Sequence, residues 1–148
     1  MSFRPFDCCL VAILLSCPAL GCFSSVLTPP ETVPVSGFVT CEGKAVPGIR
    51  VRFHPQFEME TAGLTPYGET GPDGKFLLNT GAAGNGAPQG EYLVTLEMPY
   101  IDDTSSDGLE TEIDGLKGAY SDPGKSEWKV TLVDGDNVLP PFEIQRPR

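Results

Sequence analysis

The chain has 148 residues and a formal net charge of −10. This excess of acidic residues argues against nucleic acid as a partner, because affinity for nucleic acid depends on lysine and arginine side chains that meet phosphates. It also opposes adhesion to anionic lipid head groups, so attachment to a membrane would need a separate anchor. The length suits one domain with a modest core.

The N-terminal segment has the pattern of a bacterial lipoprotein signal peptide. Arg4 supplies a positive charge, residues 10–15 are apolar, and the segment ends in Ala19-Leu20-Gly21-Cys22. A signal peptidase requires small side chains before the cut, and a lipoprotein requires a thiol directly after it to carry the lipid. We therefore predict a signal peptide over residues 1–21 and lipidation of Cys22, which would attach the mature protein to a membrane.

Cys17 is the alternative lipidation site, because Leu14-Leu15-Ser16-Cys17 is a second possible lipobox. Cys22 is favoured since it leaves a longer apolar region and places glycine directly before the cut. A plain secretory peptide is a further possibility. An uncleaved anchor is disfavoured, because the apolar run is shorter than the ~20 residues needed to span a bilayer and Pro18 interrupts it.

A tether rich in Ser, Thr and Pro is predicted over residues 22–33, and a single domain over residues 34–148. Four of the five cysteines precede the domain, which leaves Cys41 without a partner for an internal disulfide. We expect Cys41 to be a small, partly buried residue at a strand end and not a reactive thiol.

From residue 34 onward the sequence predicts strands separated by glycine-containing turns. The alternation is clear in Ile49–Phe53, where Ile49, Val51 and Phe53 share one face. The predicted strands cover residues 35–39, 49–53, 75–80, 91–97, 128–133 and 138–144. Pro140 and Pro141 cannot donate to a ladder, so the last strand should lie at an edge or carry a bulge. The pattern predicts an all-β fold, an antiparallel Ig-like β-sandwich of about seven strands.

Residues 99–125 do not fit the strand pattern and are predicted to form a long acidic loop. Its carboxylates could offer oxygen ligands to Ca²⁺. They are Asp102, Asp103, Asp107, Glu110, Glu112 and Asp114. Their spacing matches no known calcium loop, so a solvated loop is the preferred interpretation and we expect no bound metal or cofactor.

Four segments occur in a recognisable order. They are Val35-Ser-Gly-Phe-Val39, Gly43-Lys-Ala-Val-Pro-Gly-Ile-Arg-Val-Arg-Phe53, Thr70-Gly-Pro-Asp-Gly-Lys-Phe76 and Pro88-Gln-Gly-Glu-Tyr-Leu-Val-Thr95. Together they resemble carboxypeptidase regulatory-like domains, which are transthyretin-like β-sandwiches. The C-terminal run from Ala119 to Asn137 is similar to small bacterial lipoproteins built from one such domain. The resemblance covers about residues 35–144 and implies a fold, whereas function depends on sites.

Enzymes with related folds provide a test for catalysis. Intradiol dioxygenases hold iron with two tyrosines and two histidines, and transthyretin-like hydroxyisourate hydrolases use more than one histidine. This chain has one histidine, His54, which falls on the polar face of its predicted strand. We expect it to be a solvated surface residue and not a general base, because a base needs a partner and a pocket. The comparison therefore implies no catalytic residue.

A binding role is the second class of function, since some related sandwiches stack glycans on exposed aromatic side chains. The possible platforms are Phe38, Tyr67, Tyr100 and Tyr120, although Tyr120 and Trp128 are expected to pack in or beside the core. Our leading hypothesis is a non-enzymatic, lipid-anchored module of the cell envelope with a structural or protein-interaction role. The alternative is a lipoprotein that binds glycans or peptides.

Overall fold

The computed structural model describes residues 31–59, 65–81, 85–102 and 110–145. The predicted signal peptide and both candidate lipidation sites, Cys17 and Cys22, lie outside the described residues. Among the described residues, no helix is long and apolar enough to span a membrane.

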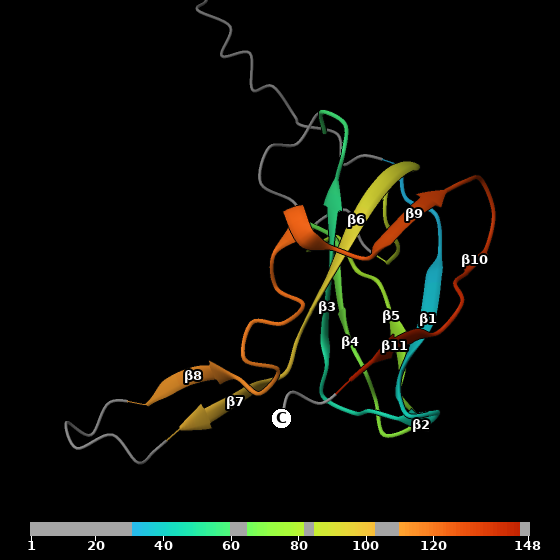
Figure 1. Cartoon of the computed structure of the whole chain (residues 1–148). Helices are drawn as coiled ribbons and strands as arrows, with labels where there is room; N and C mark the ends of the chain where they lie inside the picture. The colour runs from blue at the N-terminus through green and yellow to red at the C-terminus, as the bar shows by residue number, and fades with distance from the viewer. Residues whose placement is uncertain (1–30, 60–64, 82–84, 103–109, 146–148) are drawn as a thin grey trace, which may run out of the picture.

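The first of two sheets is built around β1 (Val35–Cys41) (Figure 1). On one side β1 pairs in antiparallel fashion with β5 (Lys75–Leu77) and β2 (Lys44–Ala45). On the other side it pairs in parallel with β10 (Asn137–Val138) and β11 (Phe142–Ile144). These pairings make β1 the central strand of the sheet.

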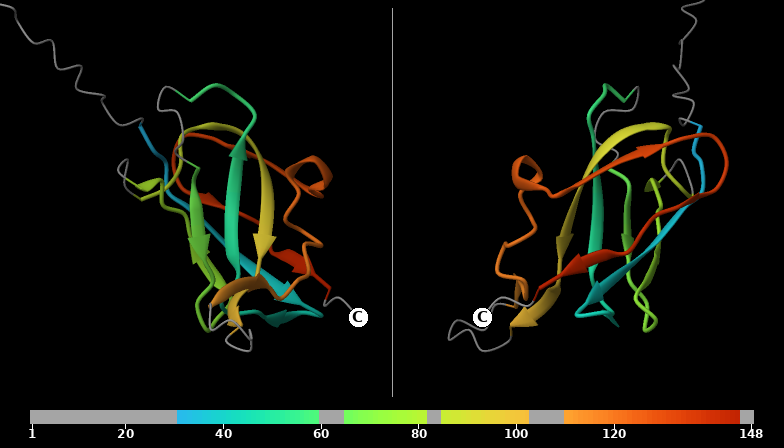
Figure 2. Two further views of the ribbon diagram at one scale, coloured as in Figure 1. Left: turned by 90° about the vertical axis from the view of Figure 1, so that its left-hand side faces the viewer. Right: turned by 45° about the vertical axis from the view of Figure 1, so that its right-hand side comes forward.

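The second sheet is fully antiparallel and has the order β4-β3-β6-β9. Its strands are β4 (Tyr67–Glu69), β3 (Arg50–Pro55), β6 (Gly90–Glu97) and β9 (Trp128–Leu132). β1 and β11 run obliquely to β3 and β6, so the two sheets form the layers of a sandwich (Figure 2).

A two-stranded hairpin projects from one end of the sandwich (Figure 1). It consists of β7 (Pro99–Asp102) and β8 (Thr111–Asp114), and a single 3₁₀ turn, η2 (Pro123–Lys125), follows it. The prediction of one long loop over residues 99–125 is therefore wrong. These strands carry too few apolar residues to show an alternating pattern, and tertiary contacts described below hold them in place.

The core lies between the two sheets. Alternation along β3 and β6 turns Val51 and Phe53 inward together with Tyr92, and all three are fully buried. The Phe53 ring packs against Tyr92 with the ring centroids 5.8 Å apart. The Tyr92 hydroxyl donates a hydrogen bond to the Pro88 carbonyl at 2.8 Å, which satisfies the only polar atom that this ring brings into the core.

These observations confirm the all-β sandwich. The described residues form eleven strands and not about seven, because β2, β4, β7 and β8 are too short or too polar to show in the sequence. The parallel pairing of β1 also departs from the predicted antiparallel arrangement. It arises because the C-terminal segment crosses from the second sheet back to the first, and no local pattern reveals such a crossover.

The expectation that the last strand lies at an edge or carries a bulge is confirmed, and the C-terminal segment does both. Within the described residues, β10 and β11 pair only with β1. The partners of Val35 and Val39 are Asn137 and Phe142, so four steps along β1 correspond to five along this segment. The extra residue falls at the Pro140–Pro141 pair, where two consecutive residues lack a backbone donor.

Candidate functional site

The outer face of the second sheet carries a shallow trough between β4 and the base of the β7–β8 hairpin. Two hollows of about 220 and 200 Å³ make up this trough, and both are lined by Arg50 and Arg52. Thr65 and Tyr67 complete the first hollow. The lining of the second is completed by Glu97, Pro99, Glu112, Ile113 and Asp114.

Strand register places these residues together. Because Val51 and Phe53 face the core, Arg50 and Arg52 must face outward. The neighbours of Arg50 across the sheet are Glu69 on β4 and Glu97 on β6. The neighbours of Arg52 across the sheet are Tyr67 on β4 and Thr95 on β6. One row across the sheet is therefore Glu69, Arg50 and Glu97, and the next is Tyr67, Arg52 and Thr95.

Arg50 lines both hollows of the trough and is held in place by Glu112. Its guanidinium donates two hydrogen bonds to the Glu112 carboxylate, at 2.8 and 3.2 Å. This pairing is the main reason that the pKa of Arg50 is raised and that of Glu112 is lowered. Both charges are stabilised by a forked contact, which also ties the hairpin to the second sheet.

Arg52 is freer than Arg50. Its side chain is 44% exposed, and its Nε lies 3.6 Å from a Glu97 carboxylate oxygen, too far for a good hydrogen bond. Among the described residues, no hydrogen bond of the Arg52 guanidinium is found, and the contact with Glu97 is its nearest ion pair. Most of its five N–H donors therefore have no protein acceptor among the described residues.

Asp114 holds the base of the hairpin. Its carboxylate accepts hydrogen bonds from the backbone N–H groups of Met98, Leu116 and Gly118, at 2.8, 2.9 and 2.9 Å. A carboxylate with three backbone donors acts as a clamp, because these charge-assisted bonds fix the strand end and the turn after it. Leu116, close to this clamp in the chain, is a buried core residue, so the segment after the hairpin is packed against the sandwich.

Of the carboxylates considered as calcium ligands, Glu112 and Asp114 lie at the same hollow, but each is engaged with protein donors. Asp103 and Asp107 lie outside the described residues, Glu112 pairs with Arg50, and Asp114 serves as the clamp. In the described ranges, no group of three His, Cys, Asp or Glu side chains is placed to hold a metal ion.

His54 lies on the outward face of β3, as expected, but it is only partly exposed and not fully solvated. Its Nε2 shares a hydrogen bond of 2.8 Å with the hydroxyl of buried Thr95. Burial is the main cause that lowers the pKa of His54, and nearby Arg52 adds to it while Glu97 opposes it. His54 thus covers Thr95 on the outer face of the sheet.

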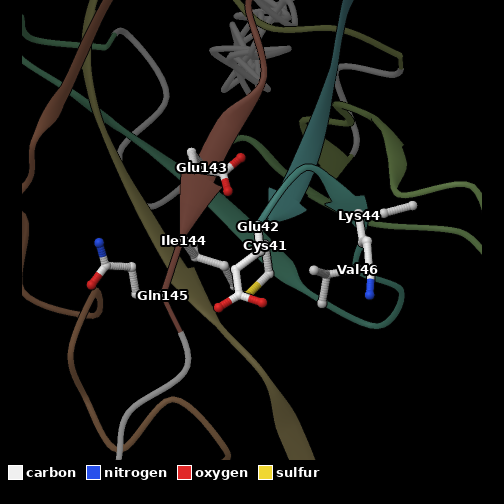
Figure 3. A pocket seen from close by; sticks show the side chains of 8 residues that line it. Cys41, Glu42, Lys44, Val46, Glu143, Ile144 and Gln145 are labelled. Atoms are coloured by element: carbon white, nitrogen blue, oxygen red, sulfur yellow. The ribbon is translucent and has the colours of Figure 1, made fainter.

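A third hollow, which we call the basin, opens at the end of the sandwich near the β1–β2 turn (Figure 3). Its volume is about 760 Å³, and Cys41, Val46 and Ile144 are its buried lining residues. Glu143 at the rim accepts hydrogen bonds from the Thr40 hydroxyl and, at 3.2 Å, from the Gly43 N–H. These bonds, led by that from Thr40, lower the pKa of Glu143. As expected, Cys41 is a buried residue at a strand end.

The candidate aromatic platforms lie on different surfaces. Phe38 is 37% exposed on β1, whereas Tyr67 and Tyr100 are each 50% exposed, on β4 and on the hairpin. Tyr120 packs on Trp128 with centroids 5.4 Å apart, and its hydroxyl accepts the Gln145 N–H. The prediction that Tyr120 and Trp128 pack beside the core is confirmed, so only Tyr67 adjoins a hollow lined with polar side chains among those described.

Sequence reasoning did not single out Arg50 and Arg52 as site residues. Alternation along β3 already placed both on the outward face. The missing signal was the identity of the neighbouring strands, because only tertiary pairing brings Tyr67 and Glu112 beside them.

No protein-family model matches the chain, and no curated protein matches it. Among solved structures it is similar to the major pilin subunit BcpA of Bacillus cereus, with 16% sequence identity and a TM-score of 0.42. The match covers 79% of this chain and 30% of the pilin chain. A likeness this distant carries no argument about function, and the fold described above rests on the strand pairings themselves.

Proposed function

We propose that this protein is a non-enzymatic, lipid-anchored module of the bacterial cell envelope with a structural or protein-interaction role, related to the carboxypeptidase regulatory-like domains. The observation that supports this most is the arrangement of the two ends of the sandwich. Residues 31–34 lead into β1 at one end, which we call the attachment end, and the β7–β8 hairpin projects at the other (Figure 1).

This arrangement suits a protein tethered by its N-terminus. Between Cys22 and Val33 the chain reaches at most about 40 Å when fully extended. A lipid on Cys22 would therefore keep the attachment end close to the bilayer and leave the hairpin directed away from it. The exposed Tyr100 and Ile101 on the hairpin would then be available to other envelope proteins, on the periplasmic side or at the cell surface.

The non-enzymatic part of the proposal is supported by the perturbed titratable groups. Catalytic sites gather such groups in one pocket. Among the described residues, Arg50 and Glu112 shift each other's pKa through their hydrogen-bonded pair, and the other shifted groups lie outside the hollow that this pair lines. Each of those other shifts has a structural cause in burial or in a hydrogen bond. The groups with shifted pKa values are Arg50, His54, Tyr92, Glu112 and Glu143.

Metabolic labelling with palmitate tests the anchor. Cells expressing the wild type, Cys22→Ala and Cys17→Ala are compared at equal expression. Label should appear on the wild type and on Cys17→Ala and disappear from Cys22→Ala. Loss of label from Cys17→Ala alone would show that Cys17 carries the lipid. An unlabelled wild type would refute lipid anchoring.

Site-specific photo-crosslinking in intact cells tests the protein-interaction role. The crosslinker replaces Ile101 on the hairpin or, as a matched control, Val133 near the attachment end, since these side chains are 56% and 58% exposed. Protein adducts should form at position 101 in clear excess over position 133. Equal adducts at both positions, or none at 101, would contradict a hairpin that faces partners.

A glycan- or peptide-binding lipoprotein is the second candidate function. The trough favours it, because the trough joins the half-exposed ring of Tyr67 to the free donors of Arg52.

A further inference from the structure

We propose that the trough binds a neutral, hydroxyl-rich oligosaccharide, with Tyr67 as its stacking surface and Arg52 as its principal hydrogen-bond donor. The inference rests on the ligand-binding candidate function and does not depend on the lipid anchor. It is carried by the charge balance of the trough, by the exposure of these two side chains, and by the pairing of the Tyr67 backbone with Asn79 at the edge of β4.

The charge balance disfavours an anionic ligand. Arg50 is compensated by its forked contact with Glu112, and Glu97 lies 3.6 Å from Arg52. Glu69 adds a third carboxylate beside Arg50. An anionic ligand would have to displace one of these carboxylates and would also meet the overall charge of −10. A neutral ligand avoids both penalties.

The side chains match the two kinds of surface that a sugar ring presents. Tyr67 is 50% exposed and offers an aromatic face on which the C–H face of a pyranose can stack. Arg52, its direct neighbour across the strand pair, offers planar N–H donors to hydroxyl oxygens. Glu97 and Glu112 at the other end of the trough have acceptor oxygens for hydroxyl hydrogens. One ring over Tyr67 and a second over Arg52 would fill both hollows.

A peptide is disfavoured because it usually gains affinity by adding a strand to a free sheet edge. At Tyr67 the edge of β4 beside the trough is already paired with another segment. The Tyr67 N–H donates to the Asn79 carbonyl at 3.0 Å, and the Asn79 N–H donates back to the Tyr67 carbonyl at 2.8 Å. β3 and β6 are interior strands with neighbours on both sides. A peptide in the trough could therefore contact side chains, but it could not form backbone hydrogen bonds with Tyr67, β3 or β6 as an added strand would.

The hollows of about 220 and 200 Å³ are smaller and more open than an enclosed ligand pocket. Binding should therefore be weak, with a dissociation constant on the order of a millimolar, because a shallow site removes little ligand surface from water. A lipid-anchored protein would reach useful avidity by presenting many copies to one polysaccharide.

Titration calorimetry and NMR shift mapping on the full chain, in a detergent without a sugar head group, test the inference. The probes are hexamers of glucose in α- and β-linkage, the hexamer of N-acetylglucosamine, and polyglutamate as an anionic control. At least one neutral hexamer should bind and shift the amide signals of Tyr67, Arg52 and Glu97. Polyglutamate should not bind.

The variants are Tyr67→Ala and Arg52→Ala, with Tyr100→Ala as the matched control, since Tyr100 is as exposed as Tyr67 but lies on the hairpin outside the trough lining. Affinity should fall about tenfold in the first two and less than about twofold in the control. Circular dichroism checks that each variant is folded.

No binding to any neutral hexamer, preferential binding of polyglutamate, or an equal loss in Tyr100→Ala would each overturn the proposed site. These outcomes leave the palmitate result untouched, so a failed trough and a failed anchor are distinguishable. An anchored protein without glycan affinity would retain only the structural or protein-interaction role.

Discussion

Gly37 is a position in β1 where a side chain cannot be added without moving the core. A β-carbon built there would lie 2.6 Å from Cζ and 2.7 Å from Cε1 of Phe76, the residue directly opposite on β5. The Phe76 ring is fully buried, stacks on Phe142 with centroids 5.8 Å apart, and contacts Phe53 at 6.4 Å. The ring therefore has no free space into which it can retreat.

The substitution Gly37→Ala is expected to lower the free energy of unfolding by about 1–2 kcal/mol. Ordinary contact begins near 3.4 Å, so the ring or the strand must move by about 0.8 Å. Overpacking of this kind destabilises by about 1–3 kcal/mol, and the reduced freedom of the unfolded chain offsets it by about 0.4–1 kcal/mol. The remainder is a substantial part of a total stability of about 5–15 kcal/mol.

Urea unfolding followed by circular dichroism measures this change, and the midpoint should fall by about 1 M. The double substitution with Phe76→Leu should be less destabilising than the sum of the two single changes, because the shorter side chain vacates the clash. Gly124→Ala is the control, since its β-carbon meets only the exposed Asp122 carboxylate, and it should change stability by less than about 0.5 kcal/mol. Additive single changes, or a Gly37→Ala midpoint equal to that of the control, would refute the packing argument.

Three further predictions concern single polar groups. Burial raises the pKa of Tyr92 from 10.0 to about 12, so its stabilisation is complete below pH 10 and is lost as pH rises to about 12. Tyr92→Phe should flatten that alkaline decline in urea titrations and cost about 1 kcal/mol at neutral pH by leaving the Pro88 carbonyl unpaired; an unchanged alkaline slope would contradict it. Asp114→Ala should destabilise by about 2 kcal/mol and speed hydrogen exchange of the amides it binds, and unchanged exchange would argue against the clamp. The hydrogen bond from Thr40 lowers the pKa of Glu143, so its stabilisation is present above the unfolded pKa and lost as pH falls through the folded value. The melting-temperature gap between wild type and Glu143→Gln should therefore narrow in acid, and a constant gap would count against that reasoning.

The strands that the sequence predicted are those in which side-chain alternation is a local property. Ile49, Val51 and Phe53 repeat with a period of two, and all are buried. The glycine-containing turns were also predicted, and Gly74 shows the physical reason. Its backbone φ is +72°, and a β-carbon there would lie 2.8 Å from the Val39 carbonyl oxygen. Residues 99–125 lacked such a signal, since the bond that closes the base of the hairpin joins Asp114 to the Met98 N–H across 16 positions, and no short pattern encodes that pairing.

The sequence by itself determined which side chains face the core and which face outward, because a two-residue period and a turn residue act within a few positions of the chain. It also supplied the expectation of a signal peptide and a lipid on Cys22, which depends on residue types in a row and not on a fold. The tertiary structure alone decided which outward side chains meet. Arg50 reaches Glu112 across 62 positions of the chain, and Arg52 lies beside Tyr67, because register between non-adjacent segments follows from packing of the whole sandwich.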